Sequence, residues 1–145
     1  MQSNPLSPDT DGDALTDYLE VRQTQTSPIL WDIDSDGLGD GEELNPQHGD
    51  ESSDPLLPDT DNDGLNNSGE RDIGTSPRLP DTDGDGLTDG EEVLTYGSNP
   101  LSKDTDNDGI PDFEEIHTFG VSSTNKDTDK DGLDDCWEVK SGTDP

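Results

Sequence analysis

Apolar residues in this chain occur in short sets that long acidic stretches separate. Three of the sets are Val93, Leu94 and Tyr96, then Phe113, Ile116 and Phe119, then Cys136, Trp137 and Val139. Each set follows an acidic segment and fits about two helical turns, as in the stretch from Asp112 to Phe119. Helices of this length are not stable alone. We therefore expect each set to form a small core with the neighbouring segment of chain.

Glycine and proline mark where these helices stop. Gly74, Gly97, Gly120 and Gly142 stand where helix-ending glycines belong. Connectors such as Ser-Asn-Pro and Thr-Ser-Pro then keep the chain extended before the next acidic segment. The pattern predicts a chain that is mostly loop with short α-helices and little or no β-sheet.

The acidic segments are copies of one another. The string Asp-x-Asp-x-Asp starts at Asp9, Asp32, Asp59, Asp81, Asp104 and Asp127, at spacings of 22 to 27 residues. We number the twelve-residue segments from these starts as loops 1 to 6, at 9–20, 32–43, 59–70, 81–92, 104–115 and 127–138. Self-similarity at such a period is the signature of a repeat array. We expect residues 1–145 to form a single tandem array of six repeats, with one irregular connector at 45–53.

Charge sets a condition on folding. The chain has 38 acidic and 7 basic residues, a net charge of -31, and 22% hydrophobic residues. Such a composition normally predicts disorder, so a folded state requires cations to neutralise the acidic groups. The sign of the charge excludes nucleic acid and an anionic membrane as partners. No apolar run approaches the length of a membrane span.

Each loop has the ligand spacing of a calcium site. Calcium takes six to eight oxygen ligands, and a twelve-residue loop supplies them from positions 1, 3, 5, 7, 9 and 12. Position 7 contributes its backbone carbonyl and position 12 a bidentate glutamate, while position 6 is a glycine for a sharp turn. Of the 38 acidic residues, 29 fall on these ligand positions, whereas a merely solvated acidic surface would scatter them. We predict about six Ca²⁺ ions, one per loop.

The predicted ligands are Asp9, Asp11, Asp13, Leu15, Asp17 and Glu20 in loop 1; Asp32, Asp34, Asp36, Leu38, Asp40 and Glu43 in loop 2; Asp59, Asp61, Asp63, Leu65, Asn67 and Glu70 in loop 3; Asp81, Asp83, Asp85, Leu87, Asp89 and Glu92 in loop 4; Asp104, Asp106, Asp108, Ile110, Asp112 and Glu115 in loop 5; and Asp127, Asp129, Asp131, Leu133, Asp135 and Glu138 in loop 6. Two loops deviate, because Ala14 replaces the glycine of loop 1 and Asn67 replaces the position 9 aspartate of loop 3. The sequence therefore predicts that loops 1 and 3 bind most weakly.

Other chemistries fit less well. Magnesium demands a tight octahedron and keeps its waters, and zinc prefers Cys and His ligands. An active site is not repeated six times, and no serine–histidine or cysteine–histidine constellation occurs in a recognisable context. We predict that the chain is not an enzyme.

The loops resemble the bacterial thrombospondin type 3 repeat family, with its EF-hand-like calcium-binding DxDxDG repeats, from Asn4-Pro5 to Asp144-Pro145. EF-hands and cellulosomal dockerins put the apolar residue at position 8, whereas here it stands at position 7. The resemblance implies calcium binding within secreted or cell-surface bacterial proteins, where such repeats serve as stalks between other domains. We therefore expect an excerpt of a longer extracellular chain whose array continues beyond residue 145, with neighbouring domains as partners.

A second function stays open at this stage. The repeats could form a calcium-dependent adhesion or protein-docking module, which would bind another surface protein or a matrix component. Leu30-Trp31 and Leu56-Leu57 are the candidate contacts, because neither pair has a fixed place in the repeat.

Overall fold

The computed structural model describes residues 4, 6–45 and 51–145. The chain divides into two compact units, one up to Leu79 with loops 1 to 3 and one from Pro80 to Pro145 with loops 4 to 6. Part of the irregular connector that the sequence predicts, residues 46–50, lies outside the described residues.

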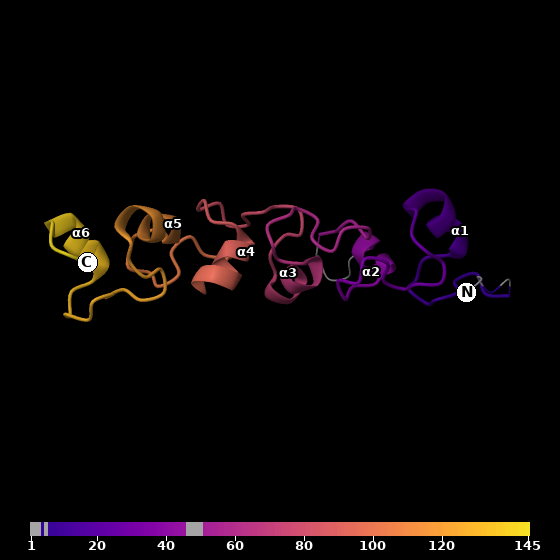
Figure 1. Cartoon of the computed structure of the whole chain (residues 1–145), viewed down its shortest axis with the longest axis horizontal. Helices are drawn as coiled ribbons and strands as arrows, with labels where there is room; N and C mark the ends of the chain where they lie inside the picture. Colours follow the sequence, from indigo (N-terminus) through magenta and orange to yellow (C-terminus); the bar gives the residue numbers. More distant parts are fainter. Residues whose placement is uncertain (1–3, 5, 46–50) are drawn as a thin grey trace. The chain divides into compact units, whose positions relative to one another are not determined.

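Short helices and long loops make up the described residues, which contain no β-strand. Figure 1 shows each helix as one short coil between stretches of irregular chain. The α-helices are α1 (Asp17–Leu19), α2 (Asp40–Leu44), α3 (Asn67–Ile73), α4 (Asp89–Glu91), α5 (Asp112–Glu114) and α6 (Asp135–Ser141). The predicted fold class is confirmed.

Three of the helices widen into π-helical turns after the position 12 glutamate. These are η1 (Glu20–Thr24), η2 (Glu92–Tyr96) and η3 (Glu115–Phe119). In each, the residue five places after the glutamate is left-handed and donates its N–H to the glutamate carbonyl, as Gly97 does to Glu92 at 2.6 Å. In α3 and α6 the left-handed glycine comes four places after the glutamate, and the helix stays α. The glutamate-to-glycine spacing thus sets the helix type.

The predicted helix ends are confirmed. Gly74, Gly97, Gly120 and Gly142 all have a φ between 73° and 94°, a left-handed conformation that glycine adopts without a Cβ clash. Asp112 to Phe119 is helical throughout, as α5 followed by η3.

The apolar core is thinner than the sequence suggests. In loops 1 to 5 the buried apolar residue is the one at position 7, and Leu87 is completely buried. The helical sets expected to form small cores are only partly covered, since Leu94 is 64% exposed and Trp137 is 52% exposed. Cys136 alone of its set is buried. The helices are too short to cover two faces, so one face stays in solvent while the other packs on the acidic loop.

No helix among the described residues combines the length and the apolar character that crossing a bilayer requires.

Candidate metal sites

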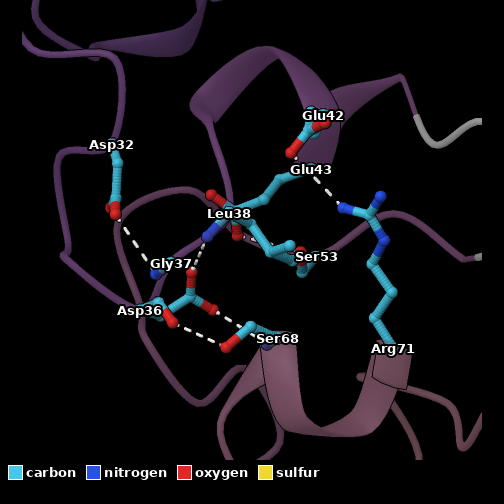
Figure 2. A network of polar contacts seen from close by, with 9 residues as sticks. All are labelled: Asp32, Asp36, Gly37, Leu38, Glu42, Glu43, Ser53, Ser68 and Arg71. Carbon is cyan, nitrogen blue, oxygen red and sulfur yellow. Dashed lines mark hydrogen bonds and ion pairs between the residues drawn. The ribbon is translucent and has the colours of Figure 1, made fainter. Parts of the chain in front are cut away.

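The aspartate at position 1 closes each loop. One of its oxygens accepts the N–H of position 4 at 2.6–2.7 Å in loops 1 to 5. The other accepts the N–H of position 6 at 3.0–3.3 Å in all six loops. In loop 2 the second bond joins Asp32 to Gly37 (Figure 2). Two backbone donors on one carboxylate hold the chain in a tight ring, from which the following side chains point inward.

Positions 4 and 6 are both left-handed. At position 6 the five glycines have φ values of 98° to 114°, and Ala14 in loop 1 has a φ of 80°. The glycine requirement that the sequence predicts is thus real, and Ala14 meets it under strain. Position 4 is also left-handed, with φ between 62° and 86°, and sequence reasoning missed it. Glycine or asparagine in four of its six residues was the signal available.

The glutamate at position 12 is a deeply buried ligand candidate in every loop. All six glutamates are no more than 2% exposed. Both carboxylate oxygens of Glu20 and of Glu115 lack a hydrogen-bond partner, as does one oxygen of Glu92 and of Glu138. Position 3 also has buried oxygens without a hydrogen-bond partner, namely one oxygen of Asp34, Asp83 and Asp106 and both oxygens of Asp11. Buried carboxylates without partners are strongly unfavourable in an otherwise ordinary protein interior.

Burial and mutual repulsion show in the acidity of these groups. Burial, followed by the charges of nearby aspartates, raises the pKa of Glu20 from 4.5 to about 7 and that of Glu115 to about 9. The pKa values of Glu43 and Glu92 rise to about 8 for the same reasons, although Ser53 and Ser98 each donate a hydroxyl that opposes the rise. Without a cation, these sites therefore compete for protons near neutral pH.

Position 5 serves two repeats. One oxygen of each of these aspartates accepts the N–H of position 7 at 2.7–2.9 Å. In three loops the other oxygen accepts an N–H from position 10 of the following repeat: Asp36 from Ser68, Asp85 from Phe113 and Asp108 from Cys136. Figure 2 shows the Ser68 side chain bonded to Asp36 as well, through the carbonyl oxygen at 2.6 Å. The loop that would hold one ion is thereby also the docking surface for the next helix.

Position 9 is held by its own loop. Its Oδ1 accepts the N–H of position 2 at 2.8–2.9 Å in all six loops. Where position 2 is threonine and position 9 is aspartate, the hydroxyl bonds the second oxygen at 2.6–2.8 Å. These bonds occupy part of the acceptor capacity of the position 9 carboxylate. Its role as a ligand in the same loop stays a prediction, as does that of the position 7 carbonyls.

The residues present fit a hard divalent cation. The first three aspartates lie within 4.8 Å of one another, measured between one oxygen of each, in loops 1 to 4. Oxygen-only donors, with buried oxygens that have no partner, match the ligand preference of calcium and give zinc or copper nothing soft to bind. Arg71 pairs with Glu42 at 3.3 Å on the surface (Figure 2).

Part of this chain is similar to solved protein structures. A search of curated proteins gave no match. Among solved structures, the chain is similar to a BSP domain and a B domain of biofilm associated proteins, at 45% and 44% identity and TM-scores of 0.29 and 0.30. Each match covers 30% of this chain and only 8% or 11% of the other, so the chain spans about a tenth of those chains.

The family described as "Bacterial TSP3 repeat" matches the chain in five segments, at residues 9–28, 59–77, 81–103, 104–118 and 127–145. Together they cover about two thirds of the chain and include the acidic loops 1, 3, 4, 5 and 6. On that match and the repeated loop geometry, the chain belongs to the bacterial TSP3 repeat family.

Proposed function

We propose that this chain is a calcium-stabilised spacer or stalk of a secreted or cell-surface bacterial protein, with one ion in each of its six loops. The observation that carries the proposal is the burial of the position 12 glutamates, whose oxygens lack partners in loops 1 and 5. A structure built around such groups is stabilised when a cation neutralises them. The repeats contain no catalytic residues in this proposal, because the same carboxylates recur as ligands in every loop.

Mass action gives the size of the effect. A ligand tenfold above its dissociation constant stabilises the folded state by about 1.4 kcal/mol per site. Six sites then contribute about 8 kcal/mol, which is comparable to the whole stability of an ordinary domain. We expect each loop to bind in the range of extracellular calcium modules, about 10⁻⁴ to 10⁻³ M, and this expected range favours a location outside the cell.

Calcium removal tests the proposal directly. The chain is titrated with calcium, and then with an excess of chelator, while circular dichroism and small-angle scattering follow helix content and radius of gyration. We expect the calcium-free chain at pH 8 to expand and lose most of its helix signal. Magnesium at the same ionic strength is the control and should restore much less. An unchanged spectrum and radius in chelator would rule out calcium as the stabilising element.

A docking role is the second candidate, supported by exposed apolar side chains. Leu30 and Trp31 are 51% and 52% exposed, and Leu56 and Leu57 are 44% and 43% exposed. If they form a calcium-dependent contact, the calcium-loaded chain should bind an apolar dye, and a Leu30→Ser/Leu56→Ser variant should bind less. Equal dye binding by the wild-type chain and the variant would contradict the docking role, and the spacer would remain as the proposed function.

A further inference from the structure

Helix α2 lies directly on loop 1. A Cβ on Gly41, the second residue of α2, would stand 2.0 Å from the backbone carbonyl oxygen of Asp13. Only glycine permits that approach. The N–H of Gly41 also faces the Asp13 carboxylate and lowers its pKa, although burial, the largest effect, raises it overall. The first residue of α2, Asp40, is therefore brought to the acidic centre of loop 1.

Asp40 has a carboxylate oxygen that its own loop leaves unused. Its Oδ1 accepts the N–H of Ile33 at 2.9 Å, but its Oδ2 has no hydrogen-bond partner, and the residue is 0% exposed. In loop 1 the corresponding oxygen of Asp17 accepts the Thr10 hydroxyl at 2.8 Å. Ile33 stands at the position of that threonine and has no hydroxyl to donate. The replacement leaves Asp40 Oδ2 available for another interaction.

The Asp40 carboxylate lies beside loop 1. Carboxylate oxygens of Asp13, Glu20 and Asp40 lie within 4.8 Å of one another, and all three residues are buried. Both oxygens of Glu20 and the Oδ2 of Asp13 also lack a hydrogen bond. Among charges, the strongest influence raising the pKa of Asp40 comes from Asp13, ahead of Asp32 in its own loop. Three buried carboxylates this close together repel one another when ionised, and a cation between them removes that repulsion.

The next junction shows what happens without such a charge. There Asn67 occupies position 9, and its Nδ2 donates to Glu43 Oε1 of the preceding loop at 3.2 Å. The position 9 side chain of one repeat thus reaches the position 12 glutamate of the repeat before it. Asparagine brings a donor to Glu43 Oε1, which also accepts the Ser53 hydroxyl, while Glu43 Oε2 stays without a partner. Ionised Asp40 is an acceptor in the same place, and a cation allows it to meet ionised Glu20 favourably.

We propose that Asp40 is a ligand of the calcium ion held by loop 1, so that this ion joins the first two repeats. The inference rests on the proposed function, since it requires that loop 1 binds calcium. Occupation of loop 1 then depends on the docking of α2, and α2 docks fully only when the ion is present.

Two position 9 variants of the full chain distinguish this proposal from a site confined to one loop. Asp40→Asn keeps an oxygen for the Ile33 N–H and removes the charge, and Asp17→Asn makes the same change in the first repeat. Calcium titrations are followed by the NMR amide signals of Gly12 for loop 1 and Gly37 for loop 2. We expect Asp40→Asn to raise the calcium midpoint of Gly12 about tenfold or more, as loss of groups around a metal commonly does. Asp17→Asn should raise it less, because Thr10 already holds that carboxylate.

Folding is controlled in the same experiment. A wild-type midpoint for Gly37 shows that the second repeat is intact in Asp40→Asn. If the Gly37 midpoint is also shifted, the Ile33→Thr variant tests the proposal instead, because it keeps every charge and supplies the missing hydroxyl to Asp40. A raised Gly12 midpoint in Ile33→Thr supports the proposal, and an unchanged Gly12 midpoint overturns it. The proposal is also overturned if Asp40→Asn shifts the calcium midpoint of Gly37 but not that of Gly12, and Ile33→Thr shifts neither. Calcium-dependent signals from Gly86 in loop 4 report separately on the proposed function.

Discussion

Exchanging alanine and glycine at position 6 should change calcium affinity in opposite directions in loops 1 and 3. Ala14 has a φ of 80°, and its N–H reaches Asp9 at 3.3 Å, compared with 3.0–3.1 Å in the five glycine loops. A left-handed alanine costs about 1–2 kcal/mol. Glycine also increases the conformational freedom of the unfolded loop, which reduces the stabilisation gained from relieving this strain by about 0.4–1 kcal/mol. The net gain for Ala14→Gly is about 0.5–1 kcal/mol, which is roughly a two- to fivefold tighter loop 1.

Gly64→Ala is the reverse experiment. Gly64 has a φ of 100°, and a Cβ there would meet nothing within 4 Å, so the substitution adds backbone strain without a clash. We expect loop 3 to weaken by about the same two- to fivefold. Both variants are measured by loop-resolved NMR in a calcium titration, with Gly12 and Asn62 as reporters. If Ala14→Gly leaves loop 1 unchanged and Gly64→Ala leaves loop 3 unchanged, the left-handed turn does not limit binding and the argument fails.

Three further predictions concern pH, docking and a single ligand. In the calcium-free chain, Glu20 and Glu115 have pKa values raised from 4.5 to about 7 and about 9. Their contribution to stability is therefore complete below pH 4.5 and is lost as pH rises toward 9. Circular dichroism in chelator should show more structure at pH 5 than at pH 8, and the opposite order would contradict the prediction. Gly41→Ala should separate α2 from loop 1 at a cost of about 1–3 kcal/mol, measured by urea unfolding in calcium, whereas Ser68→Ala at the equivalent position of the third repeat should cost only about 1 kcal/mol. Glu115→Gln should weaken loop 5 and loosen the helix from Asp112 to Phe119, while the NMR signals of loop 1 stay calcium-loaded; a loop 5 as tight as before would refute the assignment of Glu115.

The sequence predicted the features that a single loop determines. The left-handed glycine of position 6 and the helix-ending glycines depend on residues close together in the chain. The π-helical turns were not predicted, although the five-residue step from Glu92 to Gly97, against four from Glu70 to Gly74, was visible. A helix prediction that counts only apolar periodicity does not register one extra residue.

Contacts between repeats were beyond the reach of the sequence. The spacing assigned Asp40 and Asn67 to their own loops, whereas the structure brings Asp40 to Glu20 and bonds Asn67 to Glu43. Nothing in a twelve-residue pattern says how closely the next helix approaches. That approach depends on Gly41, whose missing Cβ has meaning only once the carbonyl of Asp13 lies opposite it. The burial of the helical apolar sets also depends on how closely the next repeat approaches, which is why the sequence overestimates it.

These junctions change the expected order in which the loops empty. The sequence ranks loop 1 among the weakest because of Ala14, whose strain is worth roughly a two- to fivefold loss. Asp40 adds a ligand worth about tenfold or more to the same loop, so the gain exceeds the loss. In loop 2 the balance is reversed, since Glu43 Oε1 already accepts from Ser53 at 2.9 Å and from Asn67 at 3.2 Å. Only Oε2 of Glu43 is without a partner, so bidentate binding of an ion must compete with both donors. We therefore expect loop 2 to release calcium before loop 1. A chelator titration that follows Gly12 and Gly37 measures the order, and loss of the Gly12 signal first would mean that backbone strain at Ala14 outweighs the ligand from the second repeat.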